Sequence, residues 1–151
     1  MSAPKPSDPS FEARIRTSFA KQGLMATLGA SITNVVPGAV EISVIPLPAI
    51  SQQHGFVHAG AVSTIADSAA GYAALSLMPA SAGVLTTEFK INLVAPAAGD
   101  RIVARGRVVR AGRTLTLAQT EVFAQSGAQE RLIALLTATL MTIEDRDDVA
   151  D

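Results

Sequence analysis

A single run of this sequence contains loop amide and imidazole groups, the start of a helix and one carboxylate. Together these groups could perform hydrolytic chemistry. The run 52–67 begins with polar loop residues that include Gln52 and both histidines of the chain, His54 and His58. A helix that begins at Ala59 would present unpaired backbone N–H groups and the positive end of its dipole, which suit a carbonyl oxygen that gains negative charge. The run therefore predicts an oxyanion hole at the start of this helix.

Asp67 is the ionisable residue in the middle of the most apolar segment of the chain, residues 59–77. A buried carboxylate is costly unless it is hydrogen-bonded, and burial raises its pKa, which suits a general base or a nucleophile. The structural alternative is a carboxylate held by Ser or Thr hydroxyls in a polar core pocket. Asp67 follows Ala59 by about 12 Å along a helix, so we do not expect one helix to complete the site by itself.

The loop residues have structural alternatives as well. His58 could cap the helix start, His54 could be a solvated loop residue, and Gln52 could orient a water, polarise a carbonyl or simply belong to a turn. Two histidines four residues apart would suit a metal ion on a helix, but Gly55 indicates a loop and the chain has no cysteine. We expect no metal and no cofactor.

The elements that position these residues follow from the hydrophobic pattern. The proline-rich residues 1–9 predict a flexible lead-in, followed by a short amphipathic helix that Ser10 caps and Gly23 ends. A hairpin is predicted over 32–45, from two β-branched runs separated by a Pro-Gly turn. Residues 46–57 then form an irregular loop, of a length that is usually functional in a compact domain.

The segment 59–77 is apolar on nearly every face, so we expect other elements to wrap around it. Four strands are predicted after it, at 84–94, 101–110, 114–125 and 129–143. Their short connections indicate antiparallel neighbours. We predict a single α+β domain over 10–143, in which a curved antiparallel sheet of about six strands wraps around one long central helix, and a solvated acidic tail at 144–151.

Composition narrows the function classes. The 151 residues are 48% hydrophobic, which excludes a disordered regulatory segment, and 12 Lys and Arg against 13 Asp and Glu exclude a generic nucleic-acid binder. The lack of cysteine excludes a disulfide scaffold and a cysteine nucleophile. The N-terminus lacks an apolar signal core, so we expect a cytoplasmic protein. An Asp at the centre of a membrane span would cost about 2.5 to 3.5 kcal/mol, so we expect no membrane partner.

Two stretches of the chain resemble a known family. Residues 52–71, followed by 86–97, resemble the hotdog-fold acyl-CoA thioesterases of the phenylacetate-degradation (PaaI-like) branch, and the resemblance covers about residues 24–143. The core of the family motif is a loop amide, a His-Gly-Gly element and a helical Asp or Glu. Gln52 and His58 keep the family spacing to Asp67. Ala59 stands where the family usually has glycine, and it retains the backbone N–H.

The resemblance implies a hotdog fold and hydrolysis of an aryl or medium-chain acyl-CoA to a free acid and CoA. It implies Asp67 as the nucleophile or as the base that activates water, and the Ala59 N–H as the group that polarises the thioester carbonyl. Gln52 and His58 would be positioning groups, and the hydroxyl of Thr86 would face the attacking water. It also implies a homodimer that extends the sheet and shares its sites between subunits, and a tetramer of two such dimers is common in the family.

Further residues are predicted to bind the substrate. Phe56, Val57 and Tyr72 suggest an apolar acyl pocket. Arg110 and Arg113 flank a glycine turn and suit the phosphates of CoA, although each could be a solvated strand residue. The remaining predicted contacts are His54 and Gly60.

Two other functions stay open. A hotdog acyl-thioester dehydratase or hydratase also pairs a histidine with a helical carboxylate, but residues 59–67 lack the proline-containing loop of the acyl-carrier-protein dehydratases. A non-catalytic acyl-CoA-binding module would need no such chemistry. The spacing of His58 and Asp67 favours hydrolysis.

Overall fold

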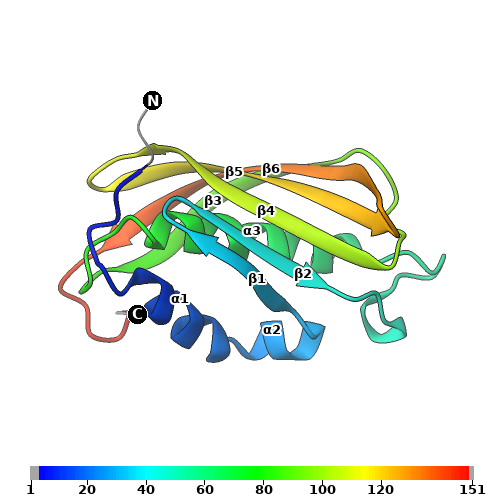
Figure 1. The fold of residues 1–151 in the computed structure, drawn as a ribbon, viewed down its shortest axis with the longest axis horizontal. Helices are drawn as coiled ribbons and strands as arrows, with labels where there is room; N and C mark the ends of the chain where they lie inside the picture. The colour runs from blue at the N-terminus through cyan, green and yellow to red at the C-terminus, as the bar shows by residue number, and fades with distance from the viewer. Residues whose placement is uncertain (1–3, 150–151) are drawn as a thin grey trace.

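The computed structural model describes residues 4–149. Its helices and strands (Figure 1) are α1 (Phe11–Ala20), α2 (Gly23–Leu28), β1 (Ser31–Val36), β2 (Ala39–Val44), a short 3-10 helix (Pro48–Ile50), α3 (Ala59–Leu75), β3 (Gly83–Leu93), β4 (Arg101–Ala111), β5 (Leu115–Ser126) and β6 (Gln129–Ile143). The two strands of the hairpin and the four later strands agree with the predicted ranges to within one or two residues.

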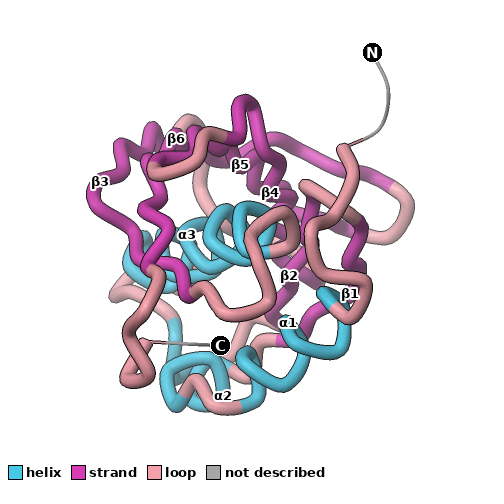
Figure 2. The backbone as a smooth tube through the Cα atoms, turned by 90° about the vertical axis from the view of Figure 1, so that its left-hand side faces the viewer, coloured by secondary structure: helices cyan, strands magenta, loops and turns pink. Residues whose placement is uncertain are grey.

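The six strands form one sheet in the order β1-β2-β4-β5-β6-β3, and every pair of neighbours is antiparallel. The sheet curves around α3, while α1 and α2 lie on the open side of the curve (Figure 2). The predicted architecture, a curved antiparallel sheet around one long helix, is confirmed. The order leaves β1 and β3 at the two edges of the sheet, and β3 is the edge strand that contacts α3.

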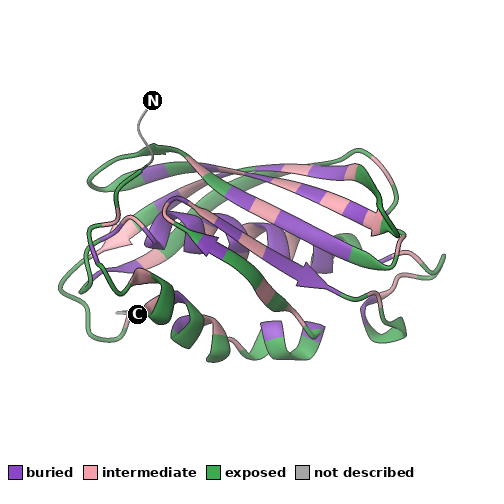
Figure 3. Ribbon diagram, in the orientation of Figure 1, coloured by how far each residue is buried: buried purple, intermediate pink, exposed green. Residues whose placement is uncertain are grey.

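The core lies between the concave face of the sheet and α3, and strand residues alternate between this face and the outside (Figure 3). One row of paired residues, Ile42, Ala104, Val122 and Ala134, crosses four strands and is fully buried. Burial of such apolar side chains contributes about 1.5 to 3 kcal/mol for each Val, Leu or Ile. This packing fixes the position of the helix that carries the candidate carboxylate.

At one point α3 comes unusually close to the sheet. Gly106 on β4 faces the helix, and a Cβ there would lie 2.4 Å from the carbonyl carbon of Ala69. On the neighbouring strand, the hydroxyl of Thr120 donates a hydrogen bond to the carbonyl oxygen of Ala66 at 2.9 Å. The lack of a side chain at residue 106 therefore sets the distance between helix and sheet.

One face of α3 is less enclosed than the sequence predicts. Ser63, Thr64, Asp67 and Ser68 are only half-buried in the single chain, whereas the pairs that alternate with them along the helix, 61–62, 65–66 and 69–70, are buried. The expectation of a helix wrapped on all sides, with Asp67 deep in the core, is wrong for this face. The reason is that the sheet and α1 and α2 cover the other sides of α3 and leave this polar stripe at an opening.

The N-terminal region also differs from expectation. Ser10 makes no side-chain cap; instead its N–H donates to the carboxylate of Asp8 at 2.8 Å. Gly23 does not end the first helix but begins α2, which is only six residues long and so shows no clear periodicity in the sequence. Residues 1–3 of the predicted lead-in, and 150–151 of the predicted tail, lie outside the described residues.

A buried arginine joins α1 to the end of α3. Arg14, with a side chain only 7% exposed, donates hydrogen bonds to the carbonyl oxygens of Pro79 at 2.6 Å and Leu75 at 2.9 Å. Its guanidinium also lies 3.6 Å from the carboxylate of Asp8. Both carbonyl oxygens also accept backbone N–H groups, from Ala82 and Met78, so Arg14 adds a second donor to each and ties α1 to the chain that follows α3. Within residues 4–149, none of the helices is long and apolar enough to cross a membrane.

Candidate active site

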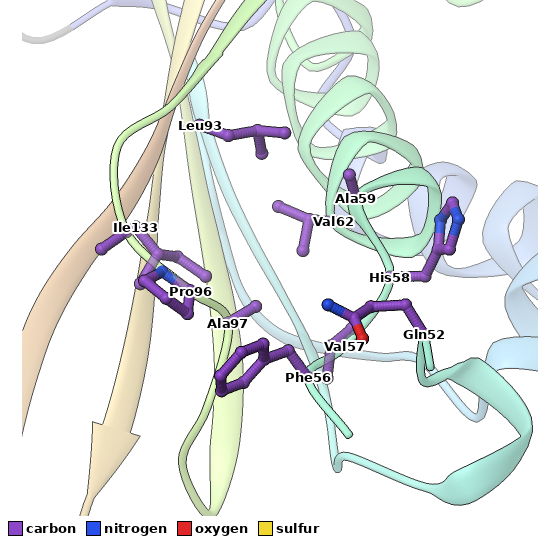
Figure 4. A pocket seen from close by; sticks show the side chains of 11 residues that line it. Gln52, Phe56, Val57, His58, Ala59, Val62, Leu93, Pro96, Ala97 and Ile133 are labelled. Atoms are coloured by element: carbon purple, nitrogen blue, oxygen red, sulfur yellow. The ribbon is translucent and has the colours of Figure 1, made fainter. Parts of the chain in front are cut away.

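The loop before α3 is held in a tight turn that orients Gln52. The N–H of Gln52 donates to the carbonyl oxygen of Phe56 at 2.8 Å, and the N–H of Gly55 donates to that of Gln52 at 2.9 Å. Gly55 has φ of +84°, a conformation that glycine adopts without strain. The backbone N–H of His54 donates a hydrogen bond to Gln52 Oε1, and the imidazole of His54 is exposed. The Gln52 amide points into a cavity (Figure 4).

At the start of α3, the backbone N–H of Gly60 is capped, whereas the N–H of Ala59, one residue earlier, is not. His58 Nδ1 accepts a hydrogen bond from the N–H of Gly60 at 2.8 Å, which is the capping role given above as the structural alternative for this residue. The histidine that accepts at Nδ1 carries its proton on Nε2. Among residues 4–149, none accepts a hydrogen bond from the Ala59 N–H. That amide is therefore available to a ligand.

The cavity beside this helix start has a volume of about 320 Å³ and is mainly apolar. Phe56 and Val57 of the loop line it, together with Leu93 at the end of β3 and Pro96 in the next connection (Figure 4). Gln52 and His58 carry the polar side chains among its lining residues, and Ala59 also lines it. Tyr72, the third residue predicted to contact the acyl group, does not line this cavity.

Asp67 lies on the half-buried stripe of α3 and faces strand β3. The hydroxyl of Thr86 donates a hydrogen bond to Asp67 Oδ1 at 2.8 Å. A β-bulge follows Thr86 in β3, between Thr86 and Glu88. Burial raises the pKa of Asp67, and the hydrogen bond from Thr86 lowers it to a smaller extent. The contact of the Thr86 hydroxyl with an attacking water stays a prediction.

A second cavity, of about 310 Å³, opens beside this carboxylate. Asp67 and Tyr72 of α3 and Thr86 of β3 line it, so three predicted residues meet here. Ala59 is not among its lining residues. One chain thus carries two half-sites: a helix start with a free amide, and a carboxylate two turns further along the same helix.

Gln22, which sequence reasoning missed, also lines the second cavity. It lies between α1 and α2 and belongs to no motif. The fold alone brings it to Asp67, so the sequence carried no signal for it.

The predicted CoA contacts are dispersed. Arg113 lines a third cavity with Met78 and Pro79, which follow the C-terminal end of α3, so it lies at the opposite end of this helix from Ala59. Arg110 is exposed on β4 close to the same turn. The contacts of both arginines with CoA phosphates stay predictions. Gly60 follows the open amide, and a Cβ there would lie 3.0 Å from the capping nitrogen of His58.

The chain is similar to known proteins in sequence and in fold. The sequence matches the family model of the thioesterase superfamily over residues 54–130. It is similar to the crystal structure of a thioesterase family protein from Silicibacter pomeroyi, with 51% identity and a TM-score of 0.87, over 89% of this chain and 98% of that chain. A protein of Halobacterium salinarum that is named provisionally as an esterase is 32% identical over 116 residues, which are 73% of this chain and 76% of the relative.

The likeness of fold extends to more distant proteins. The E. coli PaaI protein from the phenylacetic acid degradation operon aligns with a TM-score of 0.80 at 20% identity, over 89% of this chain and 94% of that chain.

Proposed function

Because the chain belongs to the thioesterase superfamily, we propose that it hydrolyses acyl-CoA thioesters, with Asp67 as the nucleophile or general base and the Ala59 N–H as the oxyanion donor. The family and the hotdog fold agree with the resemblance in the sequence, and thioester hydrolysis is the general reaction of the family. The observation that carries the finer proposal is the Asp67–Thr86 pair, a carboxylate of raised pKa held at the mouth of a cavity.

One oxygen of the Asp67 carboxylate accepts a hydrogen bond, and the other is available to the substrate. Thr86 binds Oδ1, and no residue within 4–149 donates a hydrogen bond to Oδ2. Partial burial makes the carboxylate more basic than it is in water. Oδ2 attacks the thioester carbon directly, so that an anhydride forms and the CoA thiolate leaves before water cleaves the anhydride. Alternatively it removes a proton from water, whose oxygen attacks the same carbon as the C–S bond breaks.

The helix start supplies the second function that the reaction needs. Negative charge develops on the thioester oxygen, and the free N–H of Ala59 lies at the positive end of the α3 dipole. The cap that His58 makes keeps this end of the helix ordered without occupying that amide. Gln52, fixed by its turn, presents its side-chain nitrogen to the same cavity and positions the carbonyl group or the water.

We propose that the two half-sites are joined in a homodimer. A two-fold axis that brings Asp67 of one protomer to Ala59 of its partner must pass near residue 63, midway between them on the helix. Ser63 lies on the half-buried stripe, in a cavity that it shares with Phe89 of β3. Phe89 and Leu93 are 47% and 52% exposed on this edge strand. Pairing of β3 with its copy would cover these side chains and satisfy the unpaired strand edge.

A second association is expected from the outer face of the sheet. Leu85, Met141 and Leu115 are in register on three adjacent strands and are all exposed in the single chain. An apolar row of this kind suits contact between two dimers.

The assay is release of free CoA from a panel of aryl and medium-chain acyl-CoA thioesters. We expect Asp67→Asn to abolish release while the melting temperature and the oligomeric state stay those of the wild type. The matched control is Asp148→Asn, which neutralises a carboxylate in an exposed ion pair outside the site and should leave the rate unchanged. Undiminished turnover in Asp67→Asn would contradict the assignment, and a product that retains the thioester would indicate the hydratase alternative.

A further inference from the structure

The backbone carbonyl group immediately before Asp67 has two hydrogen-bond donors. As in any α-helix, the carbonyl oxygen of Ala66 accepts the N–H four residues later, that of Ala70. It also accepts the hydroxyl of Thr120, on β5, at 2.9 Å. Thr120 and Ala66 are both fully buried. A side chain of the sheet is therefore bonded to the peptide unit that joins Ala66 to Asp67.

Thr120 is a polar residue among apolar ones. On the concave face of β5 its neighbours are Ala118 and Val122, both fully buried. A valine would fill nearly the same space without an oxygen to remove from water, and a buried hydroxyl is costly unless it has a partner. The Ala66 carbonyl is the one partner that residues 4–149 give this hydroxyl. What the threonine adds over a valine is therefore its bond to α3.

The bond acts where the helix lies closest to the sheet. Thr120 pairs with Gly106 of β4, and a Cβ on Gly106 would lie 2.4 Å from the carbonyl carbon of Ala69. The glycine allows the close approach but has no side chain that could bond to the helix. The hydroxyl on the adjacent strand supplies the attachment, three residues earlier on α3. These two paired residues of the sheet thus fix the distance of α3 from the sheet beside Asp67.

Asp67 is held from two strands, in two different ways. The hydroxyl of Thr86, on β3, donates to Asp67 Oδ1 at 2.8 Å and so orients the carboxylate. Thr120 is bonded one peptide unit earlier and fixes the backbone from which that side chain extends. Because Thr120 is fully buried, it cannot touch a substrate. Its effect on a reaction at Asp67 must pass through the position of the helix backbone.

We propose that Thr120 is a positioning residue for Asp67: its hydrogen bond to the Ala66 carbonyl keeps the carboxylate at the distance from the thioester that the reaction needs. The inference rests on the proposed hydrolysis at Asp67. Thr120 takes no part in bond breaking, and substrate binding does not depend on it.

Replacement of Thr120 by valine would put a methyl group in place of the hydroxyl. A C–H group approaches a carbonyl oxygen only to about 3.3 to 3.6 Å, so a methyl carbon in place of the oxygen at 2.9 Å would push the Ala66 carbonyl away by about 0.5 Å. A displacement of about 1 Å can cost on the order of 100-fold in rate. We therefore expect Thr120→Val to lower kcat by about tenfold, with KM within about twofold of the wild type.

The test compares Thr120→Val with Thr120→Ser on an acyl-CoA that the wild type hydrolyses. The serine variant loses a buried methyl group but keeps the hydroxyl. Both variants should lower the melting temperature by about 2 to 4 °C, whereas kcat of Thr120→Ser should stay within about twofold of the wild type. If Thr120 were merely structural, kcat would follow the melting temperature in both variants, and equal losses of kcat would overturn the inference.

Thr116→Val is the matched control. Thr116 is buried on the same face of β5, and among residues 4–149 its hydroxyl is bonded to no residue of α3. Its kcat should equal that of the wild type, and a tenfold loss would overturn the inference. If Thr120→Val does not fold, Thr120→Ala takes its place. Thr120→Ala differs from Thr120→Ser by one oxygen atom, so its kcat should fall below that of the serine variant, and equal values would overturn the inference.

The outcomes separate this inference from the proposed function. If Asp67→Asn abolishes hydrolysis while Thr120→Val keeps the full kcat, the proposed function stands and only this inference fails. Absence of hydrolysis by the wild type with every thioester would overturn both.

Discussion

Substitution of Gly106 by alanine tests whether the close contact of α3 with the sheet sets the position of Asp67. The added Cβ would lie 2.4 Å from the carbonyl carbon and oxygen of Ala69 and 2.7 Å from the backbone nitrogen of Ala70. These neighbours are backbone atoms of a buried helix, so no side chain can rotate away. Ordinary van der Waals contact begins near 3.4 Å, and the helix must therefore move away from β4 by about 1 Å.

This movement has a cost in stability and in catalysis. Overpacking of a core costs about 1 to 3 kcal/mol, and we expect the upper end, because the displaced helix also stretches the 2.9 Å hydrogen bond from Thr120 to Ala66. For a chain of this size, about 3 kcal/mol lowers the melting temperature by roughly 6 to 12 °C. Asp67 lies less than one turn before Ala69, and a displacement of about 1 Å at a catalytic group can reduce kcat on the order of 100-fold.

Thermal unfolding followed by circular dichroism, together with kcat below the melting temperature, measures both effects. Gly23→Ala is the matched control: no atom lies within 4 Å of the Cβ that it would add, and its φ is not positive, so neither quantity should fall. A melting temperature for Gly106→Ala within about 2 °C of the wild type would refute the reasoning from helix–sheet distance. Normal kcat in a destabilised variant would show that the position of Asp67 does not depend on this contact.

Two further predictions concern the carboxylate and the buried arginine. The Asp67 carboxylate acts only when ionised, so activity is lost as the pH falls through its raised pKa; Thr86→Val removes the hydrogen bond that lowers this pKa, and the acid limb of the kcat/KM profile should move to higher pH. An unchanged acid limb would exclude this role of the hydroxyl. Arg14→Met leaves the buried carboxylate of Asp8 unpaired and should reduce the free energy of unfolding by about 3 kcal/mol in urea denaturation. If Asp8→Asn in the same background recovers none of this loss, the carboxylate is not its cause.

The strands and α3 could be predicted because local pattern and tertiary structure agree there. Along β5, alternate residues such as Thr116 and Thr120 are buried while Leu115 and Leu117 face outward, and this period of two identifies a strand whichever face is buried. Hydrophobicity alone does not identify the buried face of this strand, because Leu115 and Leu117 lie on the outer face of the sheet. The period of two identifies the strand, whereas which of its faces is buried depends on the elements that pack against it.

Features that depend on non-local contacts could not be predicted. The six residues of α2 are too few for a periodic signal, and Gln22 reaches the cavity only because α1 and α2 pack across α3. The partial exposure of Asp67 has a similar cause: the sequence shows an apolar helix but does not show which of its faces the rest of the chain leaves open. The roles predicted for Gln52, His58, Ala59 and Asp67 are implied by the resemblance to the family motif, and the structure adds that His58 caps the helix.

The shared site is the central claim, and complementation between two inactive variants tests it most directly. Asp67→Asn disables the carboxylate half-site, and Gln52→Ala disables the half-site at the helix start. If each site combines Asp67 of one protomer with Gln52 and Ala59 of its partner, a mixed dimer of the two variants contains one site with no substitution and one with both.

Co-refolding of equal amounts of the two inactive variants should therefore restore activity. Random pairing makes half of the dimers mixed, and each mixed dimer has one intact site of two, so the account predicts about one quarter of the wild-type kcat per protomer. The single-variant preparations, refolded in the same way, should stay inactive. A mixture that forms dimers but remains as inactive as its components would contradict the account, because it would mean that Gln52 and Asp67 act within the same chain.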